Sequence, residues 1–133
     1  MTSETTIDPG DATTGELAGP AFAHALAGRD FAKLQSLLDP EIEFRALTPR
    51  RTWEANGDVP TVDLFRNWFD DATVIEKVEQ VDLDAVGDRQ HLVYRFSGHD
   101  DEAPFVVEQQ LYFTERDGRI DWMRMMCSGF RPR

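Results

Sequence analysis

The sequence predicts an α+β protein in which three N-terminal helices pack into a curled antiparallel sheet. Two observations support this class. Apolar residues recur at helical spacing before residue 40 and again after residue 60, whereas from residue 74 onward they alternate as they do in strands. Helices early and strands late are typical of an α+β fold. A long sheet that curls around helices leaves a concave end, where a pocket is expected.

Each helix has a recognisable start or stop. The first is expected to begin near Pro20 and to end at Gly28. Asp30 is the expected N-cap of the second helix, which the Asp-Pro pair at 39–40 terminates. Pro60 opens the third helix, whose apolar stripe ends with a Trp-Phe pair at 68–69.

Five strands are expected around these helices. The first alternates between apolar and charged residues over 41–47, and residues 48–59 are expected to form a loop. The pairs Gly87-Asp88 and Asp117-Gly118 have the composition of tight hairpin turns. The four later strands are expected at 74–86, 89–97, 105–116 and 119–130.

The domain organisation is expected to be simple. Residues 1–18 are polar and interrupted by Pro and Gly, which predicts a disordered N-terminal tail, and residues 19–133 are expected to form one domain. The start of the chain has neither a basic segment nor an apolar one, so no signal peptide is expected. No apolar run approaches the ~18 residues of a membrane span, and a cytoplasmic location is expected.

Charge and cysteine content limit the partners. The formal net charge is −11, so a nucleic acid or an anionic membrane would be repelled, and neither is an expected partner. One cysteine and three scattered histidines have no metal-ligand spacing, so no metal site is expected. The sequence contains no glycine-rich phosphate loop and no nucleophile elbow, and no cofactor is expected.

Three local phrases carry a family resemblance. They are residues 27–31 (AGRDF), 38–44 (LDPEIEF) and 115–120 (ERDGRI). With their order and spacing, the chain resembles the SnoaL-like branch of the nuclear transport factor 2-like superfamily, which includes ketosteroid isomerases. The resemblance implies a cone-shaped α+β barrel, often dimeric through the outer face of its sheet, with a pocket between helices and sheet. Members include isomerases, cyclases, dehydratases, epoxide hydrolases and non-catalytic domains, so the fold does not decide the function.

The catalytic groups of ketosteroid isomerases are absent. Aligned through Asp30 and the turn at 117–118, the positions of the family's tyrosine and two aspartates correspond to Phe22, Ala46 and Gln110. None of these side chains can perform the matching proton transfer. Because these three positions lack the family's catalytic side chains, ketosteroid isomerase activity is not expected for this chain.

The strand at 105–116 offers another acid or base. Glu108, Gln110 and Tyr112 alternate along one face, and the family alignment places that face inside the cone. A carboxylate in an apolar cavity has a raised pKa, so Glu108 is a candidate general acid or base, with Tyr112 and Gln110 orienting the ligand. The alternative is that Glu108 is hydrogen-bonded internally or lies on a solvated rim.

The last strand offers an apolar wall. By the same alignment Met123, Met125 and Cys127 line the pocket, where methionines suit a hydrophobic ligand. Ordinary core packing is the alternative, and Cys127 is expected to be a buried, inert thiol because no base lies beside it. Trp122 and Met126 fall on the opposite face, where a dimer contact is expected.

Four further residues are candidate ligand contacts: Phe22, Trp53, Trp68 and His91. Trp53 lies in the loop before the third helix, where it can cover an apolar ligand or simply pack on Trp68. Phe22 is expected on the inner face of the first helix, and His91 on a strand face that can reach the cavity. The expected partners are a small apolar or amphipathic molecule and a second copy of the chain. Two interpretations remain: a cofactor-free isomerase, cyclase or hydrolase, or a non-catalytic ligand-binding or dimerisation module.

Overall fold

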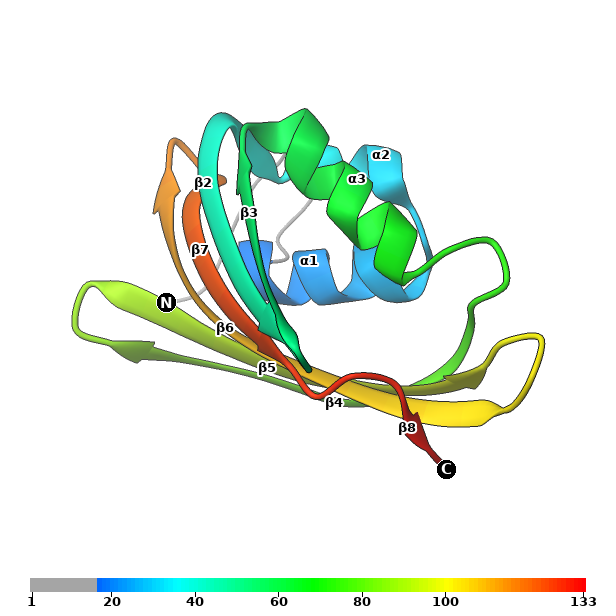
Figure 1. Cartoon of the computed structure of the whole chain (residues 1–133). Coiled ribbons are helices and arrows are strands. Elements are labelled where there is room, and N and C mark those ends of the chain that lie inside the picture. The colour runs from blue at the N-terminus through cyan, green and yellow to red at the C-terminus, as the bar shows by residue number, and fades with distance from the viewer. Residues whose placement is uncertain (1–16) are drawn as a thin grey trace.

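Three helices lie at the N-terminal end of the computed structural model, which describes residues 17–133 (Figure 1). They are α1 (Ala18–Ala27), α2 (Phe31–Ser36) and α3 (Asp58–Trp68). The Asp30 carboxylate accepts a hydrogen bond from the backbone N–H of Lys33 at 3.0 Å, so the expected N-cap of α2 is present. The tail expected at residues 1–18 falls, except for its last two residues, outside the described part of the chain.

The sheet has seven strands in the order β3-β2-β7-β6-β5-β4, with β8 paired to β6. Their bounds are β2 (Leu38–Thr48), β3 (Arg51–Asn56), β4 (Val74–Val86), β5 (Arg89–His99), β6 (Pro104–Arg116), β7 (Arg119–Cys127) and β8 (Arg131–Pro132). Several details differ from expectation, among them the end of β7 at Cys127, where a strand as far as residue 130 was expected, and the additional strand β8. Residues 51–56, expected to lie in a loop, form β3, and β2 pairs with β7 in parallel, so the sheet is mixed.

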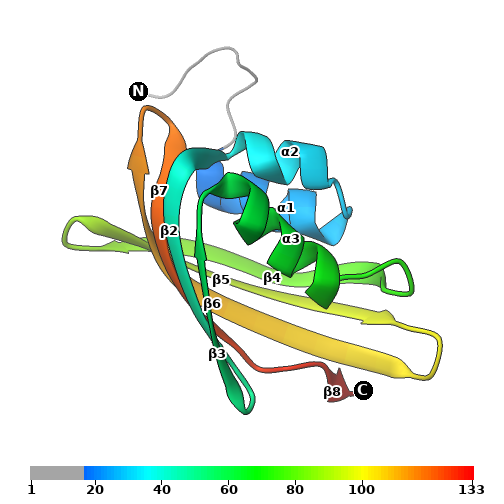
Figure 2. The same ribbon diagram turned by 45° about the horizontal axis from the view of Figure 1, so that its top comes forward.

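The α+β class and the curled sheet are confirmed. Figures 1 and 2 show the sheet bending around the helices, which lie on its concave side. The sheet does not close into a barrel, because β3 and β4 are its two ends and do not pair with each other. One apolar core fills the space between helices and sheet, with Phe22, Phe44 and Phe65 fully buried at its centre. No helix in residues 17–133 is both long and apolar enough to cross a membrane.

A β-bulge in the last hairpin decides which side chains face the core. At the turn Glu115 pairs with Ile120, but the next pair is Thr114 with Trp122, so Asp121 is an extra residue on β7. Beyond this bulge Leu111 lies opposite Met125, whereas an unbroken ladder from the turn would place Gln110 there. Paired residues point to the same face of a sheet. Leu111 and Met125 therefore both face the core.

The bulge overturns the expected orientation of β6. Val107, Gln109, Leu111 and Phe113 are buried, while Glu108, Gln110 and Tyr112 lie on the convex face. The expectation that this polar trio lines the inside of the cone is wrong. The physical reason is a register offset of one residue, which exchanges the two faces of a strand. The inward faces expected for Met123, Met125 and Cys127 agree with their burial.

Candidate functional site

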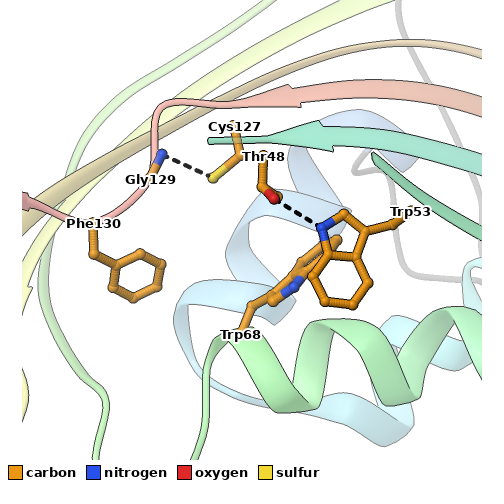
Figure 3. A pocket seen from close by; sticks show the side chains of 6 residues that line it. All are labelled: Thr48, Trp53, Trp68, Cys127, Gly129 and Phe130. Carbon is orange, nitrogen blue, oxygen red and sulfur yellow. Dashed lines mark hydrogen bonds between the residues drawn. The ribbon is translucent and has the colours of Figure 1, made fainter. Parts of the chain in front are cut away.

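A pocket of about 260 Å³ opens between the end of α3, the β2–β3 turn and the segment that follows β7 (Figure 3). Its walls are predominantly apolar and include three aromatic rings. The lining residues are Thr48, Trp53, Trp68, Cys127, Gly129 and Phe130. Of the residues expected from the sequence to contact a ligand, the structure brings Trp53, Trp68 and Cys127 together here.

The two tryptophans form one wall. Their rings meet edge to face, with centroids 5.5 Å apart, so Trp53 both packs on Trp68 and lines the pocket. The indole N–H of Trp53 donates to Thr48 Oγ1 at 2.8 Å, which fixes the ring against the β2–β3 turn. The guanidinium of Arg51 lies 3.7 Å from the centroid of the Trp53 ring. Contacts with Thr48, Arg51 and Trp68 therefore fix the position of the Trp53 ring.

The segment after β7 forms the opposite wall. Phe130 packs against Phe69 and Phe105, with ring centroids 5.4 and 4.7 Å away. Gly129 has a φ of 78°, and a Cβ there would lie 2.8 Å from the ring carbon Cγ of Pro49. Glycine therefore allows this segment to press against the β2–β3 turn and close one side of the pocket.

A chain of buried polar side chains lies behind the pocket. The hydroxyl of Tyr94 donates to Gln109 Oε1, and Gln109 Nε2 donates to Cys127 Sγ at 3.3 Å. The backbone N–H of Gly129 also donates to Cys127 Sγ at 3.3 Å. Burial, and secondarily the neighbouring Cys127, raises the pKa of Tyr94 well above 10.0, so its hydroxyl remains a donor at neutral pH.

Tyr94 and Gln109 are not among the site residues expected from the sequence. The alternation of apolar and polar residues along β5 and β6 contains a signal for both. Tyr94 shares its parity with the apolar Leu92 and Phe96, and Gln109 shares its parity with Leu111, a row that is more apolar than the Glu108 row. A polar residue within an otherwise apolar row is the expected sign of a buried hydrogen-bonded group.

The expected acid/base set lies on the other side of the sheet. Glu108 accepts from Arg95 at 2.8 Å on the convex face. His91 stacks on Tyr112, with ring centroids 4.7 Å apart, and its Nε2 lies 3.3 Å from Gln110 Oε1. The expectation that His91 reaches the cavity is therefore corrected along with that for the polar trio. These residues are assembled together, but not around the concave pocket.

Three apolar candidates lie away from the pocket. Phe22 and Met123 are fully buried, and Phe22 packs edge to face on Phe65 with centroids 5.3 Å apart. Met125 is also part of the core, although it borders a shallow convex-face hollow of about 190 Å³ together with Gln110 and Tyr112. Met123 therefore follows the alternative of ordinary core packing, and Phe22 is a core residue where a ligand contact was expected.

A second hollow adjoins the pocket and is acidic. It has a volume of about 300 Å³ and shares Trp68 and Phe130 with the pocket. Its other lining residues are Asp70, Ala72, Thr73, Asp100, Asp101 and Glu102. The backbone N–H groups of residues 102 and 103 donate to Asp100 and hold its pKa below 3.8, so this carboxylate is ionised at neutral pH.

The pocket itself contains little acid/base chemistry. None of its six lining residues carries a carboxylate or an imidazole, and Cys127 is the ionisable side chain among them. Across residues 17–133, no group of three histidine, cysteine, aspartate or glutamate side chains is arranged to hold a metal ion. The arrangement suits the burial of an apolar ring more than proton transfer.

Solved structures with the same architecture are numerous, although no protein-family model and no curated protein matches the sequence. A candidate isomerase from Rhodopseudomonas palustris aligns over 87% of this chain and 93% of its own, with a TM-score of 0.71 and 18% identity. An epoxide hydrolase of the LEH-like type from M. tuberculosis aligns over 84% and 80%, with a TM-score of 0.62 and 20% identity. The chain has the nuclear transport factor 2-like fold.

A third neighbour carries a ligand. It is a hypothetical protein from Catenulispora acidiphila with a ketosteroid isomerase-like fold, in complex with trimethylamine. It aligns over 87% of this chain and 88% of its own, with a TM-score of 0.63 and 19% identity. At these identities the likeness concerns the fold, which hosts several chemistries, so the function has to be argued from the site of this chain.

Proposed function

We propose that this protein binds a small, largely apolar molecule in the pocket between Trp53, Trp68 and Phe130. The observation that carries the proposal is the wall itself: three aromatic rings and a thiol surround a cavity of about 260 Å³. Rings fixed before binding lose little conformational entropy when a ligand is buried against them. Trp53 is fixed by its hydrogen bond to Thr48, and Phe130 by its contacts in the core.

The site favours the non-catalytic interpretation over the enzymatic one. A general acid or base has to lie within hydrogen-bond reach of the reacting atom. Glu108, the candidate for that role, lies on the convex face and pairs with Arg95. The two groups that contact the Cys127 thiol are amide N–H donors, which do not accept its proton. An isomerase, cyclase or hydrolase would need a proton acceptor that these pocket walls lack.

The same proposal includes a homodimer through the convex face of the sheet and a cytoplasmic location. Three large apolar side chains, those of Leu47, Tyr112 and Met126, are exposed on that face, and Leu47 lies beside Met126 in the β2–β7 pairing. Neighbouring exposed apolar groups are typical of an interaction surface. The cytoplasmic location is supported by the single cysteine and the net charge of −11.

Equilibrium dialysis with naphthalene tests the binding proposal. The wild-type protein is expected to retain naphthalene, and Cys127→Phe, which places a ring in the pocket, is expected to abolish that retention. Met126→Phe adds the same ring on the convex face and serves as the matched control. Trp53→Ala, which removes a wall, gives a second variant in case Cys127→Phe does not fold. Retention that is equal in all four proteins would contradict the proposal.

A further inference from the structure

Of the two indole N–H groups in the pocket wall, that of Trp68 has no hydrogen-bond partner within residues 17–133. No dashed line reaches this group in Figure 3. The indole N–H of Trp53, by contrast, donates to Thr48 Oγ1. An indole N–H is a donor only, so the group it lacks is an acceptor.

The acceptors of the neighbouring side chains are already engaged. Cys127 Sγ receives hydrogen bonds from the Gln109 amide and the Gly129 backbone. Thr48 Oγ1 receives the N–H of Trp53 and lies 3.3 Å from the carbonyl oxygen of Arg51, to which it can donate. The Gly129 carbonyl accepts from Ser128 Oγ at 2.7 Å. The pocket therefore offers a ligand the donor of Trp68 and few free acceptors.

We propose that the ligand is a neutral aromatic molecule with a hydrogen-bond acceptor, a carbonyl oxygen or a ring nitrogen, and that Trp68 binds this acceptor through its indole N–H. The inference rests on the proposed binding function and names its ligand class and a specificity-determining residue. When a ligand displaces water from the pocket, an N–H left unpaired destabilises the complex. A ligand that supplies an acceptor avoids this loss, and a hydrocarbon of the same shape does not.

The charges around the pocket favour a neutral molecule over an anion. The acidic hollow shares Trp68 and Phe130 with the pocket, and its carboxylates include the ionised Asp100. No lysine or arginine lines either cavity. A ligand carboxylate near Trp68 would therefore meet like charges, whereas the guanidinium of Arg51 lies on the ring of Trp53 and lines neither cavity.

Two probes of the same shape test the inference. 2-Acetonaphthone carries a carbonyl oxygen where 2-isopropenylnaphthalene carries a methylene group. Equilibrium dialysis gives the Kd of each probe for the wild type and for Trp68→Phe, which keeps an aromatic ring but removes the N–H. Comparing the ratio of the two Kd values between the wild type and Trp68→Phe cancels the difference in solvation of the probes, because that difference is the same for both proteins. We expect Trp68→Phe to shift that ratio against the ketone by about fivefold, the effect of one neutral hydrogen bond.

Trp122→Phe is the matched control, because it removes an indole N–H that lies away from the pocket. Its Kd ratio is expected to equal that of the wild type. If both probes bind the wild type and Trp68→Phe leaves the ratio unchanged, the role of Trp68 is wrong and the binding function stands. If neither probe binds the wild type, the binding function fails, and this inference fails with it.

Discussion

The side-chain amide of Gln109 donates to the thiol of Cys127 at 3.3 Å, across the pairing of β6 with β7. This contact links the pocket to the core, because Gln109 also accepts the hydroxyl hydrogen of Tyr94. Tyr94 and Gln109 are almost completely buried, with exposed fractions of 0% and 1%. The position of Cys127 in the pocket wall therefore depends on two hydrogen-bonded side chains that are buried behind it.

Replacing Gln109 should show how much the hydrogen bond between Tyr94 and Gln109 contributes to the free energy of unfolding. In Gln109→Leu the hydroxyl of Tyr94 loses its acceptor inside the core. We expect the free energy of unfolding to fall by about 1–3 kcal/mol, measured by urea denaturation. Adding Tyr94→Phe removes the unpaired hydroxyl, so the double variant should be more stable than Gln109→Leu alone. A double variant that is less stable would contradict this account of the hydrogen bond.

Gly129 should tolerate substitution less well than Gly87. Both have a positive φ, of 78° and 60°, but only at Gly129 would a Cβ meet another residue, Pro49, at 2.8 Å. We expect Gly87→Ala to cost about 1 kcal/mol and Gly129→Ala about 2–3 kcal/mol, because strain and steric overlap add at Gly129. Thermal unfolding of the two variants measures the difference. Equal losses would mean that the segment after β7 is not pressed against the β2–β3 turn.

Asp39 should make the protein less stable in acid. The backbone N–H of Glu41 and then the guanidinium of Arg116 hold the pKa of Asp39 below 3.8 in the folded state. A carboxyl with a lowered folded pKa stabilises the fold above its unfolded pKa, and this contribution is lost as the pH falls through the folded value. Asp39→Asn should therefore reduce the loss of stability between pH 7 and pH 3.

Urea unfolding at the two pH values measures that loss. Asp88→Asn, at an exposed carboxylate in the β4–β5 turn, is the control and should behave as the wild type does. An unchanged pH dependence in Asp39→Asn would show that the contact with Arg116 does not persist in solution.

A charge on the convex face should separate the proposed dimer. Met126 is half exposed on β7, and Met126→Asp places a carboxylate at the proposed interface. Light scattering at micromolar concentration is expected to give a dimer for the wild type and a monomer for the variant, with naphthalene binding retained in both. Val59→Asp, at an equally exposed apolar residue on α3, should remain dimeric. A monomeric wild type would contradict the dimer.

Local sequence signals determine much of the fold. Asp30 caps α2 because its side chain reaches a backbone N–H three residues away, a relationship that the sequence records directly. The turn at Asp117-Gly118 is equally local, and both residues adopt the positive φ that such a turn requires. By contrast, β3 exists through its pairing with β2 over residues 51–56, a non-local contact that its own short pattern does not reveal.

The candidate site was predicted less completely for a related reason. Its aromatic contributors Trp53 and Trp68 were identified because large rings near a pocket mouth are conspicuous in the sequence. The orientation of Glu108 and Tyr112 was wrong because the bulge at Asp121 moves the β6–β7 register by one residue. Whether a hairpin contains a bulge depends on packing across the whole sheet, and the composition of its turn does not determine it.

The indole N–H resonances of the three tryptophans test the central claim most directly. In a ¹⁵N-labelled protein titrated with naphthalene, the account predicts shifts for Trp53 and Trp68, which line the pocket. Trp122 lies away from the pocket, with the guanidinium groups of Arg89 and Arg124 packed against its ring, and its resonance should stay in place. Shifts confined to Trp122, or no shift at any of the three, would contradict binding in this pocket.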